Sequence, residues 1–166
     1  MTENETRWQR ISRATYGLAF LLIVLPIGDF LANAWPINPS LVSWRYGSLG
    51  LLSGYTLTPV LGSAMACLLA LKLEHLRVLK IFSWINLTAG VLLLILAGVF
   101  LLDGLQVRST VPVDERTFFE VGIAKALVKH LLVGASVVWF GLAGRRAAAQ
   151  NGGGRSKSNA HIIVPE

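Results

Sequence analysis

The stretch GSLGLLSGYTLTPVLGSAMACLLAL, from Gly47 to Leu71, decides the fold. Every fourth residue in it is small, in the series Gly50, Gly54, Thr58, Gly62, Ala66 and Ala70. Residues four apart lie on one face of an α-helix, so this series predicts a continuous groove about five turns long. In a bilayer, small-residue faces let helices pack closely, because contact between large apolar side chains gains little over contact with lipid. The stretch therefore predicts a membrane-spanning helix at the centre of a bundle.

The composition points to the same class of protein. Of the 166 residues, 54% are hydrophobic and 14% are charged, whereas about 25% of the residues in soluble domains are charged. The net charge of +6 would suggest nucleic acid as a partner of a soluble protein. In a membrane protein, an excess of Lys and Arg in the cytoplasmic loops accounts for it, so no nucleic-acid partner is expected. The single cysteine, Cys67, excludes a disulfide within the chain and a thiolate metal site.

Four apolar stretches predict an all-α fold, an integral membrane four-helix bundle with the lipid bilayer as its surroundings. The spans are expected at about 14–34, 47–71, 81–102 and 122–144. Roughly 20 helical residues cross the 30 Å hydrocarbon core of a bilayer. Pro59 predicts a modest kink in the second span, because its ring removes a backbone hydrogen bond and frees the carbonyl of Tyr55.

The remaining segments are predicted as connections and ends. Residues 72–80 should form a tight turn, and residues 103–121 should form the longest loop. Residues 1–13 are expected to be a cytoplasmic N-terminal segment. Residues 147–166 are rich in Gly, Ser, Asn and Gln, and this composition predicts a disordered cytoplasmic tail.

The first span has an alternative interpretation as a cleaved signal peptide. A basic start, a Leu-rich run and the sequence Ala32-Asn33-Ala34 are typical of such peptides. The run is long for the apolar part of a signal peptide, and Asp29 interrupts its end. Both features favour a retained span.

The distribution of Lys and Arg predicts the orientation in a cytoplasmic membrane. One side of the predicted bundle carries ten of them: Arg7, Arg10, Arg13, Lys72, Arg77, Lys80, Arg145, Arg146, Arg155 and Lys157. The opposite side carries five: Arg45, Arg108, Arg116, Lys125 and Lys129. Because cytoplasmic loops are enriched in Lys and Arg, both termini are expected in the cytoplasm.

Charged residues near the outer ends of the spans predict a polar pocket. Its candidate residues are Asp29, Asp103, Lys125, Lys129 and His130. A charge within a span is costly and usually finds a partner inside the bundle, so we expect Asp29 and Lys129 to pair. The alternative is an interfacial aspartate with a lysine that extends its ammonium group to the headgroups.

No sequence motif indicates catalysis or a cofactor. Glycine loops for phosphate, nucleophile elbows and paired metal-binding histidines are absent from the sequence. His130 could ligate a haem iron only alone, since His75 is expected at the opposite membrane face and His161 in the tail. We therefore expect no enzyme activity, no metal and no cofactor.

Two functional hypotheses remain after these exclusions. The first is an accessory or assembly subunit that packs against a membrane-protein partner, or against a second copy, through the groove of small residues. The second is a carrier for a small ligand, lipid or ion that uses the charged pocket. Packing of the groove inside the same bundle is the structural alternative to a partner.

The orientation can be tested by labelling single cysteines in a Cys67→Ala background. The variants Ser40→Cys and Ser109→Cys, on the predicted outer side, should react with an impermeant maleimide in whole cells. A cysteine at Ser158, on the predicted cytoplasmic side, should react only after lysis. Labelling of Ser158→Cys in intact cells would reverse the predicted topology.

Overall fold

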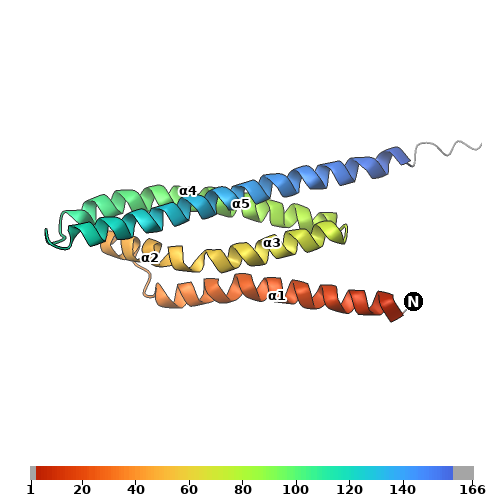
Figure 1. Cartoon of the computed structure of the whole chain (residues 1–166), viewed down its shortest axis with the longest axis horizontal. Coiled ribbons are helices and arrows are strands. Elements are labelled where there is room, and N and C mark those ends of the chain that lie inside the picture. The colour runs from red at the N-terminus through yellow and green to blue at the C-terminus, as the bar shows by residue number, and fades with distance from the viewer. Residues whose placement is uncertain (1–2, 159–166) are drawn as a thin grey trace, which may run out of the picture.

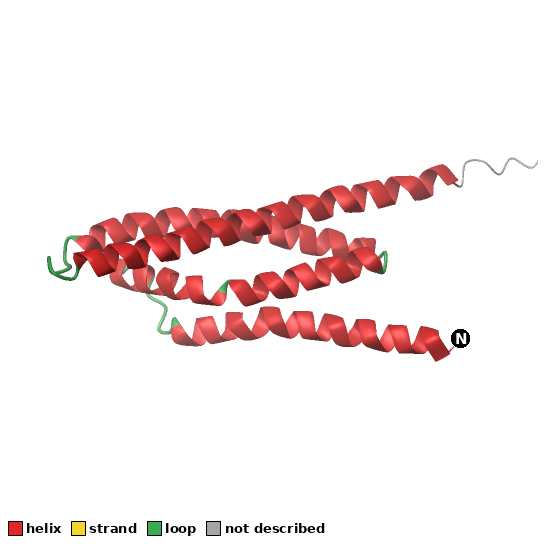
Figure 2. Cartoon of the chain, in the orientation of Figure 1, coloured by secondary structure: helices red, strands yellow, loops and turns green. Residues whose placement is uncertain are grey.

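The computed structural model describes residues 3–158, and this part of the chain is helical throughout apart from short connections. The helices are α1 (Glu3–Asn33), α2 (Val42–Tyr55), α3 (Leu57–Lys72), α4 (Leu76–Arg108) and α5 (Arg116–Ser158). Figures 1 and 2 show long helices joined by short loops, with both described ends of the chain at the same end of the molecule. We call this the basic end, and the opposite end, which holds connections 34–41 and 109–115, the loop end. The all-α prediction is confirmed.

Three helical segments are long and apolar enough to cross a membrane. They are Arg10–Asn33, Leu76–Arg108 and Arg116–Asn151. The pair formed by α2 and α3 meets the same requirement only as a unit, and it is bent by 46° at its break. The described part of the chain therefore has three candidate spans, or four if the bent pair counts as one. These helices suggest a membrane-associated protein, as predicted.

The break between α2 and α3 lies where Pro59 predicts a distortion. A proline ring clashes with the carbonyl four residues earlier, which belongs to Tyr55, the last residue of α2. The hydroxyl of Thr56 donates a hydrogen bond to the carbonyl oxygen of Ser53, at 3.4 Å. The expected modest kink is thus a break between two helices, and the prediction of one helix over 47–71 is wrong.

Both α4 and α5 are longer than the predicted spans 81–102 and 122–144. With 33 residues, α4 measures roughly 50 Å, against about 30 Å for the hydrocarbon core. A span predicted from hydropathy ends at the first charged residues. The helix itself can continue, because Lys, Arg and Leu also form helix well in water. The turn between α3 and α4 is therefore only residues 73–75, and the loop before α5 is only residues 109–115.

The predicted disorder from residue 147 onward is corrected for the part that the structure describes. Helix α5 continues to Ser158. Its residue Ala148 is buried and packs with Ala70 of α3 and Leu79 of α4. The polar, glycine-rich composition of this segment predicted disorder. The small side chain of Ala148 nevertheless packs against both α3 and α4. Residues 159–166 of the predicted tail lie outside the described residues.

Helices α4 and α5 form a close antiparallel pair along a seam of small residues. The seam repeats every seven residues and consists of Ser83, Gly90, Ala97 and Gly104 on α4 and Gly134, Gly141 and Ala148 on α5, all buried. A seven-residue repeat keeps one face of each helix turned toward its partner when the two wind around each other with a left-handed twist. The spacing of four residues that predicts the groove from Gly50 to Ala70 does not detect a repeat of seven residues.

The backbones of α4 and α5 approach each other very closely along this seam. A Cβ atom on Gly90 would lie 2.7 Å from the backbone nitrogen of Val138. A Cβ atom on Gly141 would lie 2.8 Å from the backbone nitrogen of Leu87 and 2.8 Å from the carbonyl oxygen of Ser83. No side chain can rotate away to relieve these contacts, so glycine is required at both positions.

Helix α3 lies between α1 and the α4–α5 pair (Figure 1). On one side, a Cβ atom on Gly62 would lie 2.7 Å from the carbonyl oxygen of Ala19 in α1. On the other, the hydroxyl of Ser63 donates a hydrogen bond to Oδ1 of the buried Asn86 in α4, at 2.6 Å. Within the described residues, α1 contacts α2 and α3 but neither α4 nor α5. The helices thus form a row rather than a closed ring.

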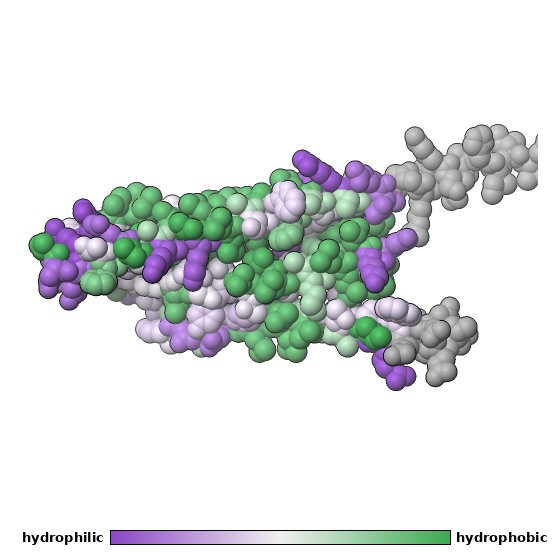
Figure 3. Space-filling view, in the orientation of Figure 1, coloured by the Kyte–Doolittle hydropathy of each residue, from purple (hydrophilic) through white to green (hydrophobic). Residues whose placement is uncertain are grey.

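The surface shows the distribution expected of membrane-embedded helices. Figure 3 shows hydrophobic residues over the middle of the visible face, with hydrophilic residues gathered toward both ends. Many large apolar side chains are exposed, among them Leu25, Leu92 and Leu132. Soluble monomers rarely expose contiguous apolar patches of this kind, whereas lipid covers them at no cost in water contact.

The seam predicts opposite effects for two glycine substitutions. Gly141→Ala should lower the free energy of unfolding by roughly 1–3 kcal/mol, because the methyl group meets the backbone of α4. Gly98→Ala, at an exposed glycine of α4 with nothing within 4 Å of a Cβ, should be neutral or stabilising, since Ala favours helix over Gly. Thermal unfolding in detergent micelles measures both. Equal effects would contradict the seam.

Candidate functional site

A partly buried ion pair between α2 and α4 is the best-defined polar feature of the loop end. Arg45 donates from Nε to Oδ2 of Asp103 at 2.9 Å and from Nη2 to Oδ1 at 2.7 Å. The carboxylate side chain is 3% exposed, while the guanidinium side chain is 29% exposed. The two parallel hydrogen bonds satisfy both carboxylate oxygens with the fork of one guanidinium group. Both oxygens of the buried Asp103 carboxylate are therefore hydrogen-bonded inside the helix packing.

The same arginine ties the 34–41 connection to the helices. Nη1 of Arg45 donates a hydrogen bond to the carbonyl oxygen of Pro39 at 2.9 Å. The indole Nε1 of the neighbouring Trp44 donates to the carbonyl oxygen of Ala34 at 3.0 Å. These contacts anchor both ends of a segment that has little regular structure of its own. The start of α2 is thus held to α4 and to the end of α1 at once.

His130 lies inside the loop end and is fully buried. Its Nδ1 is 2.8 Å from the carbonyl oxygen of Ala126. A carbonyl oxygen can only accept, so Nδ1 carries the hydrogen and Nε2 of the neutral ring is an acceptor. Among the described residues, Nε2 has no hydrogen-bond partner. The ring stacks on Phe100, with 5.7 Å between the ring centroids.

Aromatic rings connect this histidine to the surface of the loop end. The ring of Phe100 stacks on Tyr46 at 5.1 Å between centroids, and Tyr46 contacts Phe119 at 5.4 Å. Tyr46 follows Arg45 directly, so the ion pair and the aromatic stack share the first turns of α2. Together they join α2 to α4 and α5, on the N-terminal side of the break at Thr56. We call Arg45, Tyr46, Phe100, Asp103 and His130 the loop-end cluster.

The structure does not bring the five predicted pocket residues together. Asp103 and His130 are buried in the loop-end cluster, while Lys125 and Lys129 are exposed on α5. Asp29 lies on α1 and is also exposed. Its Oδ1 accepts a hydrogen bond from Nδ2 of Asn33, at 3.2 Å. The predicted charged pocket is therefore wrong as a single site.

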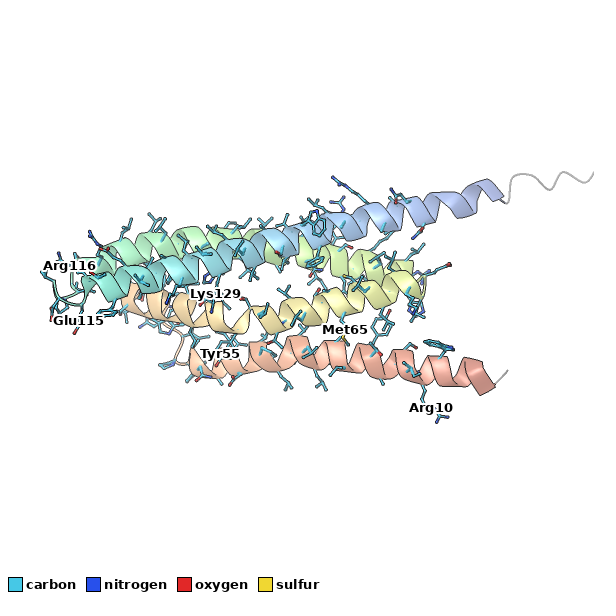
Figure 4. All side chains as sticks on the ribbon, viewed as in Figure 1. Arg10, Tyr55, Met65, Glu115, Arg116 and Lys129 are labelled. Atoms are coloured by element: carbon cyan, nitrogen blue, oxygen red, sulfur yellow. The ribbon has the colours of Figure 1, made fainter. Side chains whose placement is uncertain are left out.

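The expected pair of Asp29 with Lys129 does not form. Asp29 lies on α1 and hydrogen-bonds Tyr55, the last residue of α2. Figure 4 shows Tyr55 and Lys129 on different helices, with Lys129 on α5. Because α1 and α5 do not touch in the described part of the chain, similar depth in the membrane is not enough to join the two charges. The alternative, an interfacial aspartate with a lysine that extends its ammonium group to the headgroups, stays a prediction.

The six small residues of the predicted groove face different neighbours. A Cβ atom on Gly50 would lie 3.6 Å from the ring of Phe100, while Gly62 lies close to α1. Ala66 and Ala70 are buried, but Gly54 and Thr58 are exposed. The break at Thr56 interrupts the alignment that a continuous helix would impose. The groove is thus not continuous, and its middle faces outward.

Arg45 is absent from the predicted pocket, although it is the partner of Asp103. A signal was present: Arg45 is the only charge between Ala34 and Tyr46, and Asp103 ends an apolar run on the same predicted side. Depth in the predicted membrane also allowed Lys125 or Lys129 as the partner of Asp103. Only the arrangement of the helices shows that the partner is Arg45.

A hollow of about 480 Å³ opens beside the aromatic stack, lined by Val111, Pro112, Glu115, Phe118 and Phe119. It lies in the connection before α5 and at the start of that helix, and Figure 4 shows Glu115 and Arg116 at this tip. Within residues 3–158, no group of three or more His, Cys, Asp or Glu side chains is placed to hold a metal ion. The predicted absence of cofactors stays a prediction.

Comparisons with protein-family models, with curated proteins and with solved structures find no match to this chain.

The ion pair predicts a non-additive response to mutation. Arg45→Met should lower the melting temperature by several degrees, because it leaves the Asp103 carboxylate buried without a partner. Asp103→Asn should cost less, and the double variant should recover part of the Arg45→Met loss. Thermal unfolding of the four proteins gives the coupling.

The control is the second ion pair, in which Nε of Arg108 lies 2.6 Å from Oε1 of Glu120 and the side chains are 51% and 47% exposed. Arg108→Met should change the melting temperature little, because exposed pairs contribute little to stability. Simple additivity at Arg45 and Asp103 would show that the two charges act independently.

Proposed function

We propose that this protein is a non-enzymatic, four-span integral membrane protein that serves as an accessory or assembly subunit of a larger membrane complex. The four spans are α1, the bent pair of α2 and α3, α4 and α5. An even number of spans places both termini on one side, in agreement with the two described chain ends in Figure 1. The excess of Lys and Arg at that end supports a cytoplasmic location for both termini in a cell membrane.

The exposed middle of the small-residue series carries the proposal. Gly54 is exposed, and nothing lies within 4 Å of a Cβ built on it. Thr58, across the break, is exposed as well. A glycine that faces lipid lowers helix stability by about 1 kcal/mol relative to alanine and gains no packing within the chain. Close approach of a helix from another chain would use this small surface.

The row arrangement supports the same conclusion. Because α1 contacts neither α4 nor α5 in the described residues, the pair of α2 and α3 is not enclosed by the other helices. A partner helix can reach the exposed side of Gly54 without displacing any helix of this chain. The expected occupant is a helix of a different membrane subunit, and a second copy of this chain is the other outcome of the test.

A carrier for a small ligand, lipid or ion is the second candidate. The hollow of about 480 Å³ beside Phe119 favours it, since ligand sites are concave and mostly apolar with a few polar groups. Glu115 supplies a carboxylate to this mostly apolar lining. The carrier would thus use the tip of the loop end in place of the predicted charged pocket.

Native mass spectrometry after gentle detergent extraction tests these functions. The wild-type protein should carry a stoichiometric second polypeptide, and Gly54→Leu should lose it, because the leucine side chain occupies the contact surface. Gly98→Leu is the matched control, since Gly98 is also exposed with nothing near its Cβ, and it should retain the partner.

Three other results would each redirect the proposal. Release of a small-molecule mass from a monomer would favour the carrier. A homo-oligomer that Gly54→Leu dissociates would replace the partner subunit with a second copy. A monomer with neither partner nor ligand would contradict both functions.

A further inference from the structure

Helix α4 presents one exposed face whose chemistry changes along the helix axis. From the basic end, this face carries Arg77, Lys80, Ile81, Trp84, Thr88, Val91 and Ile95, all exposed. These positions follow the spacing of three or four residues that defines one side of an α-helix. Cations come first, an aromatic ring follows, and branched apolar side chains continue toward the middle of the helix. A phospholipid has the same order of phosphate, glycerol region and acyl chain.

An arginine from α5 joins this face at the level of the aromatic ring. The guanidinium carbon of Arg145 lies 4.3 Å from the centroid of the Trp84 ring. This distance is within the range of a favourable cation–π contact, which holds the cation at the ring. Gly144 contacts Ser83 in the α4–α5 seam, so the close packing of the helices fixes the position of Arg145 beside Trp84.

The cations at this site form no salt bridge with a described carboxylate side chain. Among the side chains that the structure describes, salt bridges join Arg45 to Asp103 and Arg108 to Glu120, both at the loop end. No salt bridge is formed there by Arg77, Lys80 or Arg145. The loop end thus neutralises two of its cations internally, while the basic end leaves these three available to an external anion.

We propose that this face, with Arg77, Lys80, Trp84 and Arg145, is a binding site for an anionic phospholipid. The phosphate lies between Lys80 and Arg145, with Arg77 one turn further out. One acyl chain follows α4 past Val91 to Ile95. The helix rises roughly 16 Å from Trp84 to Ile95, which suits an acyl chain. Clusters of basic residues next to spanning helices recognise anionic headgroups.

The occupant is a lipid because the apolar part of the face continues directly from the cationic part. Free phosphate would use only Lys80 and Arg145, whereas Val91 and Ile95 remain 45% and 59% exposed and need an apolar cover. This inference is independent of the proposed partner at Gly54, which concerns a different helix pair. Failure of one therefore leaves the other intact.

The test is native mass spectrometry of the full chain from mixed micelles with equal amounts of phosphatidylglycerol and phosphatidylcholine of the same chain length. Wild-type protein should retain phosphatidylglycerol preferentially. Each basic residue near an anionic headgroup contributes about a fivefold preference, so the double variant Lys80→Gln with Arg145→Gln should bind roughly 30-fold more weakly. Arg145→Lys should retain most of the binding, because it keeps the charge.

Lys72→Gln is the matched control. Lys72 also lies at the basic end and over a tryptophan, with its Nζ 5.7 Å from the centroid of the Trp8 ring, but on the α1–α3 side. It should leave phosphatidylglycerol binding within about twofold of wild type, a change small against the fivefold effect of a basic residue at the site. Because only folded protein retains lipid in this measurement, a melting temperature equal to wild type in phosphatidylcholine alone confirms that each variant is intact.

Several outcomes would overturn the proposal. Equal retention of the two lipids, or unchanged binding by the double variant, would show that no such site exists. An equal loss in Lys72→Gln would show a general effect of charge at the basic end. Competition by millimolar inorganic phosphate would show an anion site that does not require a lipid.

Discussion

Where Gly90 of α4 meets Val138 of α5, the two backbones come so close that a methyl group has no room. In a bilayer, helices associate through packing and hydrogen bonds rather than through the removal of apolar surface from water. Small residues every seven positions allow such packing from Ser83 to Gly104 of α4 and from Gly134 to Ala148 of α5. The remaining helices attach to this pair, with α2 and α3 against α4 and α1 against α3.

The loop end adds a second, electrostatic constraint. The Arg45–Asp103 pair joins the start of α2 to α4, and a hydrogen bond from the same guanidinium group reaches the carbonyl oxygen of Pro39. Because α2 ends at the break near Pro59, it is short and needs contacts beyond its own helical hydrogen bonds. The stack of Tyr46, Phe100 and His130 supplies apolar packing beside the ion pair. Together these contacts hold a short helix at a defined angle to a long one.

The charged side chains at the two ends of the molecule have different kinds of partner. At the loop end, two arginines are paired with carboxylates of the same chain. At the basic end, cations lie over tryptophan rings at Trp8 and Trp84. Tryptophan and basic side chains are typical of the boundary between lipid chains and headgroups. One end is thus suited to hold the fold together, and the other to contact the membrane surface.

The sequence by itself determined the all-helical fold, the apolar stretches that could span a membrane and the distortion near Pro59. These properties depend on local composition and on the covalent ring of proline. Hydropathy could not determine where helices end, because α4 and α5 continue past the apolar residues. Only the tertiary structure decided that Asp103 pairs with Arg45, that Asp29 and Lys129 lie apart and that Gly134 and Gly141 face α4. Residue spacing defines the face of one helix, whereas the neighbour of that face depends on how all the helices pack.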